Sequence, residues 1–250
     1  MSESHPRQDV AAETAADLSD FVNASPSSYH AVAAAVERLE AAGFSRLDES
    51  TAWALSPGSG HFVVRDGALI AWINPTAPAE AVPGFRVFGS HTDSPAFKLK
   101  PGEEYTAEGT RQVGVEIYGG PLLNSWLDRE LAFAGRLSLA DGTVVLARTG
   151  PIARIPQLAI HLDRQVNEGL TLDKQRHTAP VIGLADLAEA DIIELLAAST
   201  EVDPETVVGH DVYTIAAQEP ARFGATEEFF ASPRLDNLLS VHAGVTALPH

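Results

Sequence analysis

The sequence predicts a mixed α/β protein, because helical patterns stand near both ends and strand-like patterns fill the region between them. An alanine-rich segment near the N-terminus is typical of a helix, and short apolar runs separated by turns follow it. The middle of the chain keeps this strand-like character, with β-branched or alternating apolar residues in each run. From Pro233 onward, leucines recur at a spacing that favours a final helix.

The N-terminal region is predicted to contain two helices. Residues 1–15 are expected to form a frayed leader, and residues 17–23 a first short helix. A second helix is expected to begin around Ser25, whose hydroxyl can accept a hydrogen bond from a free amide of the first turn, with Pro26 at the first helical position. Gly43 is expected to end this helix in the left-handed conformation.

Strands are expected wherever short apolar or β-branched runs are bounded by turn residues. In the first part of the chain they cover residues 52–55, 61–65, 68–73 and 86–89. In the middle they cover residues 113–117, 136–139, 143–147, 157–162, 178–182 and 212–216. A helix with acidic residues in its first turn is predicted over residues 186–198.

Composition and charge exclude several classes of protein. The chain has 250 residues, of which 45% are hydrophobic and 20% charged, as in a globular protein of one or two domains. Its formal charge of -17 disfavours nucleic-acid and membrane partners. Because the sequence has no cysteine, any metal must be bound by His, Asp or Glu. No apolar run approaches the ~20 residues of a membrane span, and the polar N-terminus favours a cytoplasmic protein.

The first polar cluster that could carry chemistry contains His91 and Asp93, directly after the expected strand 86–89. Two residues apart in extended chain, their side chains leave the same face. His91 could therefore bind a metal ion while the carboxylate of Asp93 orients its imidazole. The alternative is that both residues only cap the end of a strand.

The second cluster surrounds Asp236, a carboxylate among the apolar residues Leu235 and Leu238. Such a carboxylate is costly to bury unless it is paired or bound to a metal, but it could equally be the N-cap of a helix. His161, at the end of the expected strand 157–162, could be a core or edge histidine. Purely structural roles are expected for three further polar residues, which are Glu116, Asp128 and Arg129.

Sequence motifs of other enzyme classes are missing. The segment Gly58-Ser59-Gly60 lacks the third glycine and the following helix of a dinucleotide-binding fingerprint. The sequence contains no G-x-S-x-G elbow, Walker loop, H-E-x-x-H helix or EF-hand loop. A serine hydrolase is therefore unsupported.

Six ordered motifs together resemble the aspartyl aminopeptidase family of dinuclear zinc metallopeptidases. The motifs are SPSSYHAV (25–32), GSHTDSP (89–95), VGVEIYGG (113–120), WLDR (126–129), RIPQLAIH (154–161) and PRLDNL (233–238). The resemblance extends from about Asp17 to the last residue. Any one motif would be weak, but six in the same order are a specific signal.

The resemblance implies an α/β catalytic domain of the zinc-exopeptidase type, interrupted by a β-rich oligomerisation domain. Residues 1–96 and 224–250 would belong to the catalytic domain, and residues 97–223 to the insertion. The catalytic domain is expected to be incomplete, because in the family it continues past the PRLDNL motif with an acidic pair and further Asp and His ligands. Glu103-Glu104 and Glu227-Glu228 lie at the wrong place in the order, so neither is assigned that role. The abrupt end of the last helix suggests a fragment.

The resemblance also implies roles for individual residues. His91 would be a metal ligand, Asp93 its orienting carboxylate, and Asp236 the carboxylate that bridges two metal ions. His161 would reach a neighbouring subunit's active site and help bind substrate.

The activity implied by the resemblance is metal-dependent hydrolysis of N-terminal residues, preferentially Asp and Glu, from peptides. Zinc is the expected cofactor, with two ions per site and manganese or cobalt as alternatives. The implied assembly is a dodecamer built from dimers. The alternative is a non-catalytic oligomerising fragment or subunit without a complete metal site, and the 250-residue chain alone is expected to be inactive.

Overall fold

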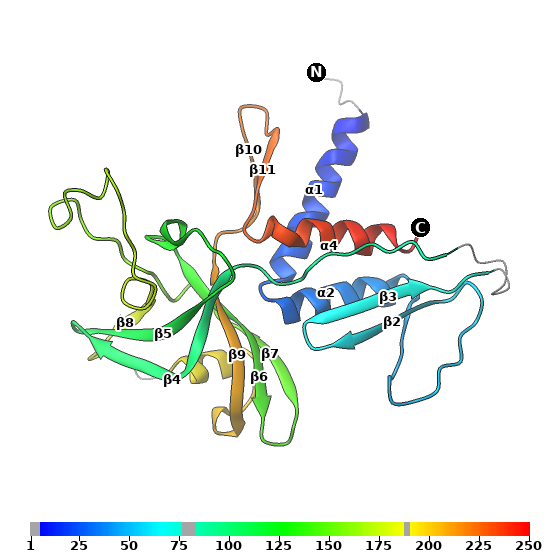
Figure 1. The fold of residues 1–250 in the computed structure, drawn as a ribbon, viewed down its shortest axis with the longest axis horizontal. Helices are drawn as coiled ribbons and strands as arrows, with labels where there is room; N and C mark the ends of the chain where they lie inside the picture. Colours follow the sequence, from blue (N-terminus) through cyan, green and yellow to red (C-terminus); the bar gives the residue numbers. More distant parts are fainter. Residues whose placement is uncertain (1–5, 77–83, 188–190) are drawn as a thin grey trace. The chain divides into compact units, whose positions relative to one another are not determined.

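The computed structural model describes residues 6–76, 84–187 and 191–250 and divides into two compact units (Figure 1). Unit 1 comprises Met1–Ser94 and Glu219–His250, and unit 2 comprises Pro95–Gln218. The β-rich insertion expected over residues 97–223 overlaps unit 2.

Unit 1 combines helices with a small sheet and a hairpin. Its helices are α1 (Pro6–Ala24), α2 (Ser28–Ala41) and α4 (Leu235–Ala247). Its sheet has the order β1-β2-β3, formed by β1 (Ser45–Arg46), β2 (Gly60–Arg65) and β3 (Ala68–Ile73). The antiparallel hairpin consists of β10 (Ala221–Phe223) and β11 (Phe229–Ala231).

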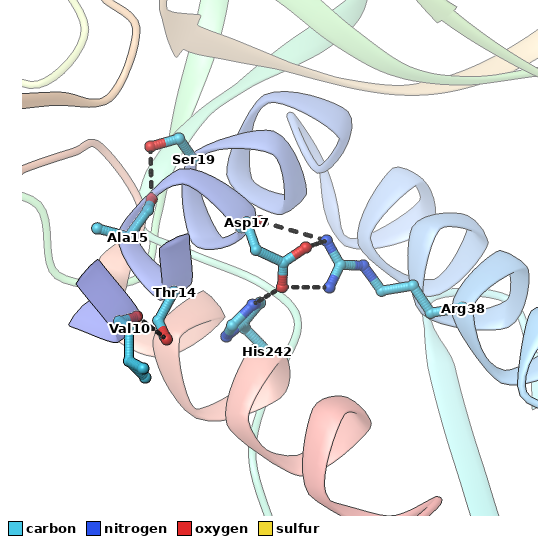
Figure 2. A network of polar contacts seen from close by, with 7 residues as sticks. All are labelled: Val10, Thr14, Ala15, Asp17, Ser19, Arg38 and His242. Atoms are coloured by element: carbon cyan, nitrogen blue, oxygen red, sulfur yellow. Dashed lines mark hydrogen bonds and ion pairs between the residues drawn. The ribbon is translucent and has the colours of Figure 1, made fainter. Parts of the chain in front are cut away.

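The helices of unit 1 pack around an apolar cluster and a polar network. Leu18, Phe21 and Val22 of α1 pack with Leu238 and Val241 of α4 and with alanines of α2. Beside this cluster, a polar network joins one residue from each helix (Figure 2).

The network consists of Asp17, Arg38 and His242. Arg38 donates from both terminal nitrogens to the carboxylate of Asp17, at 2.8 Å each, and Nε2 of the buried His242 lies 2.6 Å from Asp17 Oδ2. The guanidinium of Arg38 also lies over the ring of Phe21. The carboxylate therefore joins α1 to both α2 and α4.

The N-terminal helices differ from the prediction in length and in capping. Residues 6–15, expected within a frayed leader, belong to α1, and residues 1–5 lie outside the described part. The N-cap of α2 is Ser27, whose side chain accepts from the amide of His30, and not Ser25. Because α1 extends to Ala24, Ser25 instead lies in the turn that closes α1, where its amide donates to the carbonyl of Val22. The left-handed conformation predicted for Gly43 is confirmed by its φ of 87°.

Two strands expected in unit 1 are not formed. Residues 52–55 are irregular, and the indole of Trp53 donates to the carbonyl of Asp48. Residues 86–89 are also irregular, although β2 and β3 lie where the sequence predicts them. Both failed segments contain apolar residues but have no paired neighbour among the described strands.

Unit 2 is built on a six-stranded antiparallel sheet of order β7-β6-β9-β4-β5-β8. The strands are β4 (Ala96–Ala107), β5 (Thr110–Tyr118), β6 (Leu131–Leu139), β7 (Val144–Arg148), β8 (Val181–Leu184) and β9 (Val207–Ala216). The helix α3 (Ile192–Ala197) and short 3-10 helices at Leu123–Trp126 and Pro204–Thr206 complete the unit. Its core includes Phe97, Leu131 and Phe133, all completely buried.

The elements of unit 2 differ from the predicted strands in several places. β4 has no counterpart among the predicted strands, and β6 and β9 each begin five residues before the strands predicted at 136–139 and 212–216. The strand expected over residues 157–162 is an irregular segment that ends in a turn, and Leu158 and Leu162 in it are exposed. The strand expected from residue 178 begins at Val181. The helix expected over residues 186–198 is shorter, because Asp191 forms a capping box with Glu194, and residues 188–190 lie outside the described part.

Candidate metal centre

His91 and Asp93 lie on an irregular segment of unit 1. This segment passes α4, and the ring of Phe88 occupies the space beside Gly244, where an added Cβ would lie 2.8 Å from the ring. The expected strand before His91 is therefore replaced by an irregular segment whose Phe88 ring lies beside α4. It follows that His91 and Asp93 do not cap a strand within the described part of the chain.

Asp236 lies at the beginning of α4, where the chain has not yet become a regular helix. Arg234 has a left-handed φ of 61°, and Asp236 (φ -87°, ψ 102°) and Asn237 (φ -122°, ψ 25°) are not helical. The peptide bond between Asp236 and Asn237 is cis. The N-cap position belongs to Arg234 and no side chain caps the helix, so the interpretation of Asp236 as an N-cap is wrong.

The structure brings His91, Asp93 and Asp236 together. Nδ1 of His91 lies 3.0 Å from the backbone carbonyl oxygen of Asp93 and 3.3 Å from its Oδ1. Nε2 of the same ring lies 3.1 Å from Oδ1 of Asp236. The imidazole is thus held between the two aspartates, with each nitrogen facing one of them.

These contacts assign the protons of the imidazole. A carbonyl oxygen can only accept a hydrogen bond, so Nδ1 of His91 carries the proton that points to Asp93. In the neutral ring, Nε2 then has the lone pair, and it faces a carboxylate oxygen that is also rich in electrons. Two such atoms 3.1 Å apart repel each other unless a cation lies between them, either a second proton on the ring or a metal ion.

The arrangement fits a metal ion. Two ligands of one tetrahedral ion, each about 2.0–2.1 Å from it, are separated by roughly 3.3 Å. The separation of His91 Nε2 and Asp236 Oδ1 is close to that value at 3.1 Å. Both side chains are accessible, with exposed fractions of 51% and 84%, so an ion can reach them from solvent.

The ligand set is small within the described residues. Across residues 6–76, 84–187 and 191–250, no group of three or more His, Asp or Glu side chains has the arrangement of a metal site. A zinc site usually takes about three or four protein ligands. The described part therefore supplies one facing pair of donors, His91 and Asp236.

His161 belongs to unit 2 and lies on an exposed turn. The expected strand at 157–162 would have made it an edge histidine, but its segment turns back on itself, with the amide of Leu162 donating to the carbonyl of Ala159. The alternating Leu158, Ile160 and Leu162 have no strand beside them among the described residues.

The three polar residues for which purely structural roles are predicted each have a nearby partner. Glu116 pairs with Lys100, Asp128 accepts from the amide of Gln157, and Arg129 donates to Gln218.

The two acidic pairs, Glu103-Glu104 and Glu227-Glu228, also form ion pairs or hydrogen bonds with residues other than the candidate metal ligands. Glu103 pairs with Lys100, and Glu104 pairs with Arg111 and accepts from the amide of Ile192. Glu227 pairs with Arg222. Hydrogen bonds from its own amide, from the amide of Thr226 and from the Thr226 hydroxyl hold the pKa of Glu228 below its ordinary value. None of these contacts involves His91 or Asp236.

Two hydroxyl contacts near the site had not been assigned from the sequence. Ser94 Oγ donates to the backbone carbonyl of Asp236 at 2.8 Å, and Thr92 Oγ1 donates to the carbonyl of Gly67 at 2.6 Å. Both residues belong to the GSHTDSP motif. The signal available in the sequence was their alternation with His91 and Asp93.

No helix within the described part of the chain is long and apolar enough to cross a membrane.

Comparisons with known proteins give concordant results. A 52% identical protein from Streptomyces avermitilis, named "Probable M18 family aminopeptidase 2", matches over 235 residues, which are 93% of this chain and 54% of the relative. Among solved structures, a chain of the Ape4 and Nbr1 complex has a TM-score of 0.89 at 34% identity and covers 100% of this chain and 52% of its own length. The crystal structure of prApe1 has a TM-score of 0.82 at 29% identity, over 94% of this chain and 55% of that one.

The chain thus spans about half the length of the curated relatives it matches. The family model described as "Aminopeptidase I zinc metalloprotease (M18)" matches residues 21–250. This match covers most of both units, and the α/β fold agrees with the solved structures. The chain belongs to the aminopeptidase I zinc metalloprotease (M18) family.

Proposed function

We propose that this chain contributes a zinc-binding site to an aminopeptidase that removes N-terminal residues from peptides, preferentially Asp and Glu. Membership of the M18 family supports the reaction class. The preference for acidic residues is taken from the motif resemblance to aspartyl aminopeptidases. A cytoplasmic location is part of the same proposal.

One observation carries the metal site. Nε2 of His91 and Oδ1 of Asp236 face each other at 3.1 Å, while Nδ1 of His91 is engaged by the carbonyl of Asp93. This hydrogen bond fixes the tautomer that leaves Nε2 free to bind a cation. A carboxylate with two oxygens can serve two ions, which is the bridging role proposed for Asp236.

In this mechanism His91 and Asp236 would hold the metal, and Asp93 would keep the imidazole in its orientation. When bound, two divalent ions would lower the pKa of a shared water and polarise the scissile carbonyl. Asp236, with 84% of its side chain exposed, is open to a peptide arriving from solvent. His161 is proposed to contact substrate bound to a neighbouring subunit, which requires a homo-oligomer such as a dodecamer of dimers.

A second candidate is a non-catalytic oligomerising subunit. It is favoured by the lack of a three-residue metal cluster in the described part of the chain. In this case unit 2 would mediate assembly, and apolar side chains such as Leu158 and Leu162, which are 60% and 75% exposed, would be covered by other copies.

The metal site is tested by titrating the 250-residue chain with Zn²⁺ in competition with a chromophoric chelator. We expect His91→Ala and Asp236→Asn to weaken zinc binding on the order of 100-fold, because each removes a direct ligand. Glu13→Gln is the control for charge, and His161→Ala the control for a histidine with another role. Equal zinc affinity in wild type and His91→Ala would contradict the proposed site.

Activity and assembly separate the two candidates. EDTA-sensitive release of Asp from a peptide N-terminus supports the aminopeptidase, and faster release of Asp than of Ala supports the acidic preference. A chain that sediments as a monomer at micromolar concentration contradicts the assembly subunit.

A further inference from the structure

The residues on either side of Asp93 contact the backbone around the metal site. His91 and Asp93 contact the site through their side chains, whereas Thr92 and Ser94 direct their hydroxyl groups to carbonyl oxygens elsewhere in unit 1. The four residues form the uninterrupted run His91-Thr92-Asp93-Ser94. Along this segment, residues that face the metal site (His91 and Asp93) therefore alternate with residues whose hydroxyl groups bind backbone carbonyls (Thr92 and Ser94).

The first anchor is Ser94. Its Oγ lies 2.8 Å from the carbonyl oxygen of Asp236, which is 142 residues away in the chain. This hydrogen bond joins the two segments that carry the donor pair, because His91 is three residues before Ser94. The residue that follows the carbonyl, Asn237, is not helical, although a hydrogen bond from the amide of Leu238 to the carbonyl of Arg234 spans this stretch.

The second anchor is Thr92. Its Oγ1 donates at 2.6 Å to the carbonyl of Gly67, in the turn between β2 and β3. That turn packs closely against α2, since a Cβ at Gly67 would lie 2.9 Å from the hydroxyl oxygen of Ser28. Thr92 therefore ties the segment of His91 to the sheet, and Ser94 ties it to the start of α4.

The need for such anchors follows from the local structure. The segment 84–94 has no strand partner within the described residues, and His91 and Asp236 are both exposed. Neither ligand is therefore fixed by a sheet or by burial. A metal site requires its donors to stay within a few tenths of an ångström of their bonding positions.

We propose that Thr92 and Ser94 are positioning residues of the metal site, with Ser94 setting the distance between Asp236 and His91 through its hydrogen bond to the Asp236 carbonyl. This inference rests on the proposed zinc site. Groups that orient metal ligands typically change metal affinity by about 10- to 100-fold when they are removed. Since Ser94 joins the two donor segments directly, its loss has the larger expected effect.

The experiment compares variants of the 250-residue chain by zinc titration. Ser94→Ala is expected to weaken zinc binding by roughly tenfold, and Ser94→Thr to restore it, because threonine keeps the hydroxyl. Thr92→Val is expected to weaken binding by a few-fold, and Thr92→Ser to restore it.

The matched control is Ser19→Ala. Ser19 Oγ donates to the carbonyl of Ala15 at 2.8 Å, so this variant removes a hydrogen bond of the same kind and length from α1 (Figure 2). We expect unchanged zinc affinity in Ser19→Ala. The thermal midpoint of each metal-free variant shows whether a change in affinity is a general loss of stability.

The outcomes distinguish this inference from the proposed function. Loss of zinc affinity in His91→Ala together with wild-type affinity in Ser94→Ala overturns the positioning role and leaves the metal site standing. Equal affinity in wild type and His91→Ala removes the site, and the positioning role with it. Weaker binding in Ser94→Ala that Ser94→Thr does not restore also overturns the inference.

Discussion

Two stretches of the chain carry apolar residues, including phenylalanine, but differ in structure. In unit 2, β6 pairs with β7 on one side and with β9 on the other, and Phe133 is completely buried. In unit 1, residues 84–90 pair with no strand in the described part of the chain, and Phe85 and Val87 are 91% and 88% exposed. Alternation shows that a segment can form a strand, but a neighbouring strand decides whether it does.

The largest expected difference in the free energy of unfolding is between two alanine substitutions, one of a phenylalanine in each stretch. Phe133→Ala should lower the free energy of unfolding by about 3–5 kcal/mol, because it leaves a cavity in a packed core. Phe85→Ala should change it by less than about 0.5 kcal/mol, because the ring is largely in water. Urea denaturation measures both. A loss of several kcal/mol in Phe85→Ala would show that this ring is buried in solution, and the contrast would disappear.

A smaller effect is expected where two strands of unit 2 approach closely. A Cβ at Gly135 of β6 would lie 2.0 Å from the carbonyl oxygen of Asp211, so Gly135→Ala must push β6 and β9 apart. We expect a loss of about 1–3 kcal/mol in the same denaturation experiment.

Gly209 provides the control in β9, because no atom lies within 4 Å of its added Cβ. Gly209→Ala should stay within about 0.5 kcal/mol of wild type. Similar losses in both variants would mean that strand propensity, and not the close approach, sets the effect.

The smallest expected effects are on the pH dependence of stability, which differs between the two units. In unit 1, hydrogen bonds from Arg38 and then from His242 hold the pKa of Asp17 below its ordinary value of 3.8. In unit 2, the hydrogen bond to Asp211 raises the pKa of Lys98 above 10.5. The stability from Asp17 is therefore present above about pH 4 and lost as the pH falls through the folded-state pKa, whereas that from Lys98 is lost only as the pH rises past 10.5.

Asp17→Asn should accordingly flatten the acid limb of the stability profile, and Lys98→Met the alkaline limb. Each contribution should be at most about 1 kcal/mol, because solvent reaches both pairs. Urea midpoints measured from pH 2 to pH 11 test this. A change of the alkaline limb in Asp17→Asn would contradict the assignment.

The elements that the sequence predicts best are those fixed by local contacts. The strand predicted at residues 68–73 has those bounds in the structure, because β3 folds back on β2 through a short turn with Arg65 opposite Ala68. The left-handed conformation of Gly43 was also predicted correctly, because the end of a helix depends mainly on the residues next to it in the sequence. The strand predicted at 157–162 does not form, because no described strand pairs with it, and the sequence pattern of the segment does not show whether a pairing strand is present.

The candidate site was predictable only in part. His91 and Asp93 are two residues apart, so a shared role can be suggested from spacing. The contact between His91 and Asp236 joins distant parts of the chain, and no local pattern records it; only the motif resemblance linked them. The hydrogen bond from Ser94 to the backbone of Asp236 is even harder to predict from the sequence, because every residue has a carbonyl oxygen that could accept it.

The network around Asp17 has a practical consequence for where unit 1 can be trimmed. The family match starts at residue 21, yet Asp17 and Leu18 precede it and contact Arg38, His242 and the helix core. A chain trimmed to the matched boundary would leave the imidazole of His242 buried without its carboxylate. The range matched by the family therefore begins inside the packed helices of unit 1, and a chain produced for experiments should keep Asp17 and Leu18.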